Sequence, residues 1–419
     1  MTTSRPRPLS LLAATTALAL SATSFAPVAS AAPSAPGAPM TTSGRSFLTG
    51  YRLAPGLLKI THDRKGGNPS QVHGVLGMPR GQGPRPVVVV LHGLHPNCVT
   101  VGRTPGVARR VVKTRWPLVC ADPKKPKATP GVGPDYLRND VGLSYMVQSL
   151  TRKGFVAVSI DVLSPEVWWG GETDPEKGYT KLVDAHLRLL ADLNRGIDHG
   201  LRIKGVRGRI DTSRVGLVGH SRGGGYVLGP KAAGRAGLFG AVAVEPAVGG
   251  EPATHRVPVL NIRGACDEDT GSDAGRDTMK ALAKSRRTGV AADVLVAGTG
   301  HRMLNSNLVS TRDDDGRLGG CRAARIAKPV VARAQVAQLT AAFLCDALFK
   351  ARTYRLPALN GAAPKGGNLR KGGPVVTFVR TDRQTYTRPE RIPELVSTRR
   401  ILPAIPKNLR INKNPDGDI

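Results

Sequence analysis

The stretch RVGLVGHSRGGGYVL, residues 214–228, holds the residues whose types and spacing point most directly to chemistry. Within it, GHSRG at 219–223 satisfies the pattern G-x-S-x-G, which places a serine on a sharp turn between a strand and a helix. Ser221 would then project its hydroxyl beyond the end of a sheet, where it can act as a nucleophile. The alternative is a glycine-rich turn in which the serine is incidental. The predicted strand before Ser221 and the predicted helix after it favour the nucleophile.

A neutral serine hydroxyl is a poor nucleophile and needs an adjacent base, which a carboxylate in turn orients. The chain has nine histidines. His301 lies in AGTGHRML after a predicted strand, His220 adjoins the serine, and His92 belongs to the segment LHG. The segment VPVLNIRGACDEDTGSD offers four carboxylates, which are Asp267, Glu268, Asp269 and Asp273.

The elements around these residues must bring them together. The β-branched run at 87–91 is typical of a strand covered on both faces. Further strands are predicted in 155–163, 214–220, 238–246, 257–264 and 291–298, after two or three short antiparallel strands within 46–78. Helices are predicted over 135–154, 180–196, 223–234, 273–285 and 328–351. This alternation predicts an α/β protein with a mostly parallel central sheet flanked by helices.

Four segments in this order resemble the α/β-hydrolase superfamily: VVVVLHG, VGLVGHSRGG, VPVLNIRGACD and LVAGTGH. The resemblance covers roughly residues 71–350, and it is more specifically to secreted bacterial serine hydrolases of esterase/lipase type. It implies the α/β-hydrolase fold and the chain order serine, acid, histidine. By that order His301 is the base. By the family's spacing after the preceding strand Asp267 is the acid, and Asp269 is the second candidate.

The resemblance also implies an oxyanion hole made by the main-chain N–H groups of Arg222 and Leu94. The expected reaction is hydrolysis of a carboxylic ester, either a small molecule or a lipid or polyester-type substrate, through an acyl-enzyme on Ser221. Serine peptidases and acyltransferases use the same constellation, so they remain alternatives. A non-catalytic, cationic envelope-binding protein is a further alternative. No cofactor is implied, and no metal is expected because no Cys/His spacing fits a zinc site.

Five cysteines are present, so at least one is free or pairs between chains. Cys98, Cys120, Cys266 and Cys321 lie in or near the loops that the resemblance places at the active site. We expect disulfides between Cys98 and Cys120 and between Cys266 and Cys321, which would tie these loops together. Cys345 lies in the apolar segment AAFLCDAL and is then a buried free thiol.

Trp168 and Trp169 follow a predicted strand, on the side of the sheet where ligands bind in open α/β proteins. They could line an acyl pocket. The alternative is that they cover the domain surface or seat the C-terminal tail.

The N-terminus predicts secretion. Arg5 and Arg7 precede an apolar run at 9–20, and small residues at 29–31 fit a cleavage site, so 1–31 reads as a signal peptide. The run is too short and too rich in threonine to favour a membrane anchor.

The formal net charge of the chain is +31, and loss of the two signal arginines leaves +29. Such a charge predicts non-specific attraction to anionic cell-envelope surfaces. The alternative, which we favour, is an arginine-rich solvated surface with no specific partner. No basic run is interleaved with aromatic residues, so no specific nucleic-acid partner is expected. The sequence indicates no oligomeric state.

The 419 residues suffice for one large α/β domain with an appendage. We place the domain at 46–353 and a basic, Pro/Gly-rich extension at 354–419. The extension either packs as a strap, with a strand near 375–379, or is partly disordered.

Overall fold

The computed structural model describes residues 46–53, 72–95, 114–115, 119–120, 138–162, 175–248, 253, 255–284, 289–308, 321, 326–349, 374–380 and 385–387. The predicted signal peptide lies outside this part of the chain, as do Cys98, Trp168 and Trp169. Within it, a ten-stranded mixed sheet is flanked by helices, and a short pair, β4 (Thr114–Arg115) and β5 (Val119–Cys120), stands apart from that sheet.

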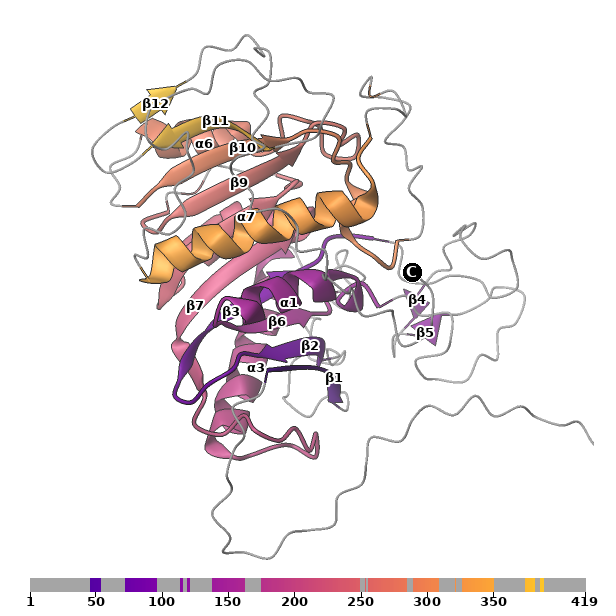
Figure 1. Cartoon of the computed structure of the whole chain (residues 1–419), viewed down its shortest axis with the longest axis vertical. Helices are drawn as coiled ribbons and strands as arrows, with labels where there is room; N and C mark the ends of the chain where they lie inside the picture. The colour runs from indigo at the N-terminus through magenta and orange to yellow at the C-terminus, as the bar shows by residue number, and fades with distance from the viewer. Residues whose placement is uncertain are drawn as a thin grey trace, which may run out of the picture. The chain divides into compact units, whose positions relative to one another are not determined.

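The strand order of the large sheet is β1-β2-β6-β3-β7-β8-β9-β10-β11-β12, and Figure 1 shows it from bottom to top. The run from β6 to β10 is parallel, and the strands outside it pair antiparallel. The strands are β1 (Phe47–Leu53), β2 (Val72–Met78), β3 (Arg85–Leu91), β6 (Val156–Ile160), β7 (Ile210–His220), β8 (Leu238–Val244), β9 (Val259–Gly264), β10 (Ala291–Val296), β11 (Pro374–Arg380) and β12 (Thr385–Thr387). The predicted α/β class with a mostly parallel sheet is confirmed.

The strand order reverses at β3, which pairs with β6 on one side and with β7 on the other. Leu91, the last residue of β3, is in register with both Ile160 of β6 and Gly219 of β7. In open α/β sheets, ligands bind beyond the carboxyl ends of the strands at such a reversal. This edge is therefore where a site is expected, and it is where β7 delivers Ser221.

Helices cover both faces of the sheet, as the unbroken apolar runs of the strands predict. On one face Val88 and Val90 of β3 pack into a core with α1 (Ser144–Arg152) and α7 (Pro329–Phe349). On the other, Val87, Val89 and Leu91 share a core with α3 (Pro175–Arg195), α4 (Arg222–Leu228) and α6 (Arg276–Lys284). Figure 1 looks onto the face covered by α1 and α7.

The predicted helices exist, but three differ in extent. The helix predicted over 180–196 begins five residues earlier, because α3 starts at Pro175. In the segment predicted as a helix over 135–154, the described residues become helical only at the 3₁₀ turn η1 (Val141–Leu143), which leads into α1. The carbonyl oxygen of Arg138 accepts from the N–H groups of Val141 and Gly142 in this turn. The carbonyl oxygens of Arg138 and Asn139 also accept hydrogen bonds from the side chains of Asn307 and Asn305.

The helix predicted over 223–234 is in fact two, α4 and α5 (Pro230–Ala233). Gly229 between them is extended, with φ −78° and ψ 167°, because it precedes a proline.

The C-terminal part of the chain contributes to the sheet. The strand expected near 375–379 is β11, which pairs antiparallel with β10, and β12 continues from it. The region assigned to an extension thus adds edge strands to the domain. None of the helices in the described ranges is both long and apolar enough to span a bilayer.

Candidate active site

The residues that could do chemistry gather where the parallel strands end. β3 ends at Leu91, directly before His92, and β7 ends at His220, directly before Ser221. Glu245 follows β8, while Asp267 and His301 lie in the loops after β9 and β10. Because parallel strands present their carboxyl ends at one edge, five consecutive neighbours in the sheet deliver these side chains to one place.

Ser221 sits on a strained turn, as the G-x-S-x-G pattern predicts. Its φ of 56° and ψ of −125° put it in a region that side-chain-bearing residues rarely adopt, at a cost of about 1–3 kcal/mol. The N–H of Ser221 donates to Val244 O at 3.0 Å, and its carbonyl accepts from Gly225 N and Ala247 N. Neighbouring backbone thus fixes both sides of the strained residue.

Close backbone packing explains the glycines of this turn. A Cβ at Gly219 would come within 2.0 Å of Gly223 O, and one at Gly223 within 2.7 Å of His92 O. A Cβ at Gly93 would lie 2.7 Å from the Oγ of Ser221. The loop after β3 therefore passes directly beside the serine hydroxyl, which requires small residues on both sides of the contact.

Asp267 and His301 are hydrogen-bonded to each other. Nδ1 of His301 donates to Oδ2 of Asp267 over 3.1 Å, and both side chains are buried. With the proton on Nδ1, the Nε2 of a neutral imidazole can accept a proton from a reacting group. This is the tautomer that a general base needs.

The turn after β9 holds the carboxylate of Asp267. Oδ1 accepts from the N–H groups of Asp269 and Thr270 at 2.9 and 3.0 Å, and Oδ2 also accepts from the Thr270 hydroxyl at 2.6 Å. Burial alone would raise the pKa of Asp267, but the hydrogen bonds and charge from His301 and Thr270 outweigh it, so its pKa lies below the usual value. Asp267 is therefore ionised at neutral pH.

Asp269, the second candidate for the acid, occupies a different place. Its Oδ2 lies 3.6 Å from Nε2 of His301, and its side chain is 50% exposed. Asp269 thus approaches Nε2, the nitrogen with which His301 would accept a proton. The acid of a triad binds the other nitrogen, Nδ1. The geometry favours Asp267.

Three histidine rings pack against one another at this edge. The ring of His220 lies 4.6 Å from that of His301 and 5.1 Å from that of His95, measured between centroids. Nε2 of His95 and Nδ1 of His220 are 3.1 Å apart, a hydrogen bond. Burial, followed by the neighbouring histidines, holds the pKa values of His95 and His220 well below the usual range. Both rings are therefore neutral at physiological pH.

A second buried network supports the loop after β3. Nδ1 of His92 donates to the carbonyl of Gly93 at 2.8 Å, and its Nε2 lies 3.2 Å from Oδ1 of Asp161. His73 approaches the other oxygen of Asp161 at 3.5 Å. Burial opposes a charge on His92, but Asp161 outweighs it and raises the His92 pKa. His92 thus orients the loop that touches Ser221.

Glu245 and His95 belong to this site but were not predicted from the sequence. Oε2 of Glu245 lies 3.5 Å from Nε2 of His220 and 3.6 Å from Nδ1 of His301. The available signal was an acidic residue directly after a buried strand, in VAVEP. For His95 the signal was a second histidine in LHGLH.

His220, Glu245 and His301 also form a set of potential metal ligands, with one atom from each within 4.8 Å of the others. However, Nδ1 of His301 already donates to Asp267, so a metal at that nitrogen would have to replace this bond. The hydrogen-bonded arrangement argues against a resident metal at this place.

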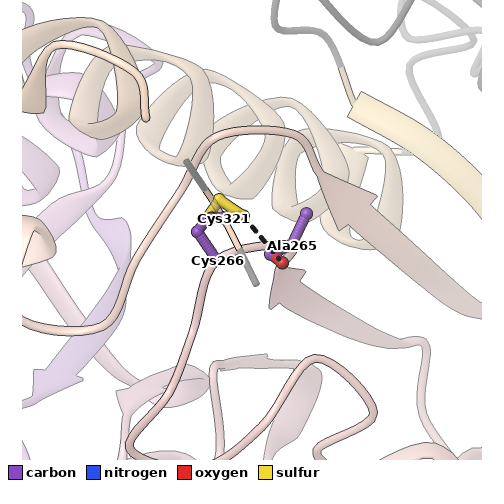
Figure 2. Close-up of a disulfide and its surroundings, with 3 residues drawn as sticks. All are labelled: Ala265, Cys266 and Cys321. Atoms are coloured by element: carbon purple, nitrogen blue, oxygen red, sulfur yellow. Dashed lines mark hydrogen bonds between the residues drawn. A yellow bond between two sulfur atoms is a disulfide. The ribbon is translucent and has the colours of Figure 1, made fainter. Parts of the chain in front are cut away.

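The structure contains the predicted disulfide between Cys266 and Cys321, whose Cα atoms are 5.6 Å apart. Figure 2 shows it beside Ala265, where the sulfur of Cys321 approaches the Ala265 carbonyl to 3.6 Å. The bond ties the residue before Asp267 to the chain beyond His301. The pairing of Cys98 with Cys120 stays a prediction, because Cys98 lies outside the described residues. The predicted buried free thiol of Cys345 is confirmed, and burial raises its pKa to about 11.

The two residues predicted to supply oxyanion N–H groups flank the serine. Arg222 is the first residue of α4, directly after Ser221. Leu94 follows Gly93 in the loop that touches the serine, and its side chain is 44% exposed. Trp168 and Trp169 lie outside the described residues, so their place relative to this edge stays a prediction.

Neither a scan against models of known protein families nor a search of curated proteins finds a match for this chain. The function is therefore inferred from the residues and their geometry.

Proposed function

We propose that this protein is a secreted serine hydrolase of the α/β-hydrolase type that cleaves carboxylic esters. The observation that carries the proposal is the hydrogen bond from His301 to Asp267 at the sheet edge where Ser221 sits on its strained turn. The topology supports it, since all three residues follow parallel strands of one sheet, β7, β9 and β10, in the chain order serine, acid, histidine.

In the proposed reaction, Oγ of Ser221 attacks the ester carbonyl carbon while Nε2 of His301 takes the hydroxyl proton. The ester C–O bond then breaks, and the same proton goes to the departing alcohol. Water adds to the acyl-enzyme by the reverse path, with His301 again as base, and releases the acid. Asp267 keeps His301 in the required tautomer and stabilises the imidazolium, without taking the proton itself.

The charge that develops on the carbonyl oxygen needs donors beside Ser221. We assign this role to the main-chain N–H groups of Arg222 and Leu94, because Arg222 directly follows the serine and Leu94 directly follows Gly93, which packs against it. Removal of one such donor typically costs about 2.7–4 kcal/mol of barrier stabilisation. The network of His92 with Asp161 serves this step indirectly, by fixing Gly93 and thus the loop that carries Leu94.

Two exposed apolar side chains lie near the serine and favour an apolar substrate. Leu94 and Val248 are 44% and 43% exposed. Leu94 directly follows Gly93, which packs against Ser221. Val248 directly follows Ala247, whose N–H donates to the carbonyl of Ser221. A small or lipid-like ester fits such surroundings, and no cofactor takes part in the proposed chemistry.

A serine-directed fluorophosphonate probe tests the proposal. The native protein should be labelled, and a folded Ser221→Ala variant should not be. Ser213→Ala removes an exposed serine from the same strand and serves as the matched control, which should label like the wild type. Native protein that does not label, or a labelled Ser221→Ala variant, would refute the nucleophile. Nitrophenyl esters of increasing acyl length, compared with peptide substrates and acyl acceptors, then separate esterase from peptidase and transferase.

The high positive charge carries a second, weaker proposal, which is contact with anionic envelope surfaces. At +29 for the mature chain, retention on such material should fall steeply as salt rises, because screening shortens the range of the interaction. Retention that does not change between low and high salt would refute an electrostatic contact.

A further inference from the structure

Glu245 is a buried carboxylate for which the proposed triad has no role. It follows β8 directly and has no exposed surface. Its Oε2 lies 3.6 Å from Nδ1 of His301, the nitrogen that also donates to Asp267 at 3.1 Å. One imidazole nitrogen therefore faces two carboxylates that come from different strands.

The backbone around Glu245 is strained and held in place. Its φ is 45°, and Glu245 and Ser221 are two of the four non-glycine residues with positive φ in the described part of the chain. The N–H of Glu245 donates to Ile262 O at 2.7 Å, and its carbonyl accepts from the Thr270 hydroxyl at 3.3 Å. Thr270 also contacts Asp267, so one side chain connects the segments that bear the two carboxylates. Strain of this kind concentrates at functional sites.

Gly264 leaves the space that the Glu245 side chain fills. A Cβ at Gly264 would lie 2.0 Å from Oε1 of Glu245 and 2.5 Å from Thr299 O. Gly264, at the end of β9, therefore leaves room for the carboxylate of Glu245, which follows the neighbouring strand β8. The same glycine lies three residues before Asp267. The place of Glu245 follows from this close packing.

We propose that Glu245 is a second carboxylate for His301: a positioning residue that, with Asp267, holds the imidazole ring and stabilises its imidazolium form during the reaction. The inference rests on the proposed function, because it concerns the base of that reaction.

Charge and distance support this role. When His301 takes the proton of Ser221, a positive charge forms on a ring with no solvent exposure, and burial disfavours that charge. A carboxylate within about 4–6 Å favours it. At 3.6 Å, Glu245 is beyond hydrogen-bond distance of Nδ1 but well inside this range, so it acts through its charge while Asp267 acts through a hydrogen bond.

The other ionisable groups that face His301 and Glu245 do not duplicate this charge. They are His95 after β3, Tyr145 on α1, His220 at the end of β7, Asp269 after β9 and Arg302 after β10. His95 and His220 are neutral near pH 7, and burial raises the pKa of Tyr145, so it is neutral as well. Arg302 is positive. Asp269 is the remaining anion, and its half-exposed charge is screened by solvent.

The test is the pH dependence of kcat/KM for a nitrophenyl ester in the wild type, Glu245→Gln and Glu245→Asp. Neutral His301 is the active form, so the acid limb of the profile reports its pKa. Removal of a negative charge beside the imidazolium lowers this pKa. Glu245→Gln should therefore move the acid limb to lower pH by about 1, and should reduce the plateau by about 10-fold to 100-fold. Glu245→Asp keeps the charge and should bring the limb back toward that of the wild type.

Three outcomes decide the matter. A Glu245→Gln profile that matches the wild type overturns the proposal. So does a lower plateau with an unchanged acid limb that Glu245→Asp does not improve, because a merely structural residue behaves in that way. Should Glu245→Gln not fold, the imidazole shift of His301 can be titrated by NMR in Ser221→Ala and in Ser221→Ala/Glu245→Ala, which removes the charge with a smaller side chain, and coincident curves overturn the proposal. An inactive, unlabelled wild type refutes the hydrolase itself, which is a separate result.

Discussion

Two buried carboxylates on neighbouring strands of this sheet have opposite kinds of partner. Asp293 lies within β10, where Arg263 of β9 donates to both of its oxygens at 2.8–3.1 Å and Asn261 donates at 2.9 Å. Asp267 lies beyond the end of β9 and binds His301 and the turn that contains Thr270. Both carboxylates are hydrogen-bonded and nearly inaccessible to water.

The difference lies in what the partner can do. The guanidinium of Arg263 is always charged, so its pair with Asp293 is permanent and joins two strands. An imidazole, by contrast, can exist in a neutral or a charged form, and the proposed reaction uses both forms. In the sheet interior a carboxylate therefore joins two strands, while at the sheet edge the proposed function gives Asp267 a role in chemistry. Replacement of each by asparagine should separate activity from stability.

Asp267→Asn is expected to have the largest effect on activity. Without the carboxylate, His301 loses the partner that selects its tautomer, and a change of this kind in a serine hydrolase lowers kcat by about 10⁴-fold. Steady-state hydrolysis and the rate of fluorophosphonate labelling measure the loss, with circular dichroism as the control for folding. Activity within tenfold of the wild type would remove Asp267 from the triad.

Asp293→Asn should show the opposite pattern. It removes the negative charge that faces the buried guanidinium of Arg263, and loss of one partner of a buried ion pair typically costs about 3–5 kcal/mol of unfolding free energy. Denaturant unfolding measures the cost. At a temperature where the variant stays folded, its kcat/KM should remain within about threefold of the wild type. A large loss of activity in the folded variant would mean that the two carboxylates are not separable.

Removal of the Cys266–Cys321 disulfide sharpens the comparison, because it loosens the turn of Asp267 and not the pair of Asp293. The bond closes a sequence separation of 55 residues, and loss of such a bond typically lowers the unfolding free energy by about 2–4 kcal/mol. Cys266→Ser/Cys321→Ser should also lose hydrolysis, unlike Asp293→Asn at matched stability. Cys345→Ser, which removes the buried free thiol, is the control for loss of a sulfur. Full activity of the double variant would show that the turn holds its shape without the bond.

The sheet was predictable where burial leaves a clear pattern. Val87 to Leu91 face cores on both sides, so the segment shows an unbroken apolar run rather than an alternation. The placement of Ser221, Asp267 and His301 at one edge of the sheet was predictable because each of them follows such a strand. The spacing implied by the family resemblance already favoured Asp267 over Asp269 as the acid. The geometry supports that choice, since the two carboxylates approach different nitrogens of the imidazole.

What could not be predicted depends on contacts between segments distant in the chain. Glu245 is a single acidic residue after a strand, and its approach to His301 arises from the adjacency of β8 and β9 and from the space left at Gly264. The cluster of His95, His220 and His301 combines three separate loops in the same way. Periodicity reports which face of a strand is buried, but not which polar side chains meet beyond its end.

The smallest expected effect concerns stability in acid. The folded-state pKa of Asp267 lies below its ordinary value, so Asp267 contributes stability that is fully present above about pH 4 and is lost as the pH falls through the folded-state pKa. The difference in unfolding free energy between the wild type and Asp267→Asn should therefore be constant from pH 7 to pH 5 and shrink toward pH 3. Asp277→Asn, at an 89% exposed carboxylate, is the control and should show little dependence. A difference that stays constant down to pH 3 would mean that the hydrogen bonds of the turn do not favour the ionised form of Asp267. Asp267 and Asp293 would then differ only in their partners, which are His301 for Asp267 and Arg263 for Asp293.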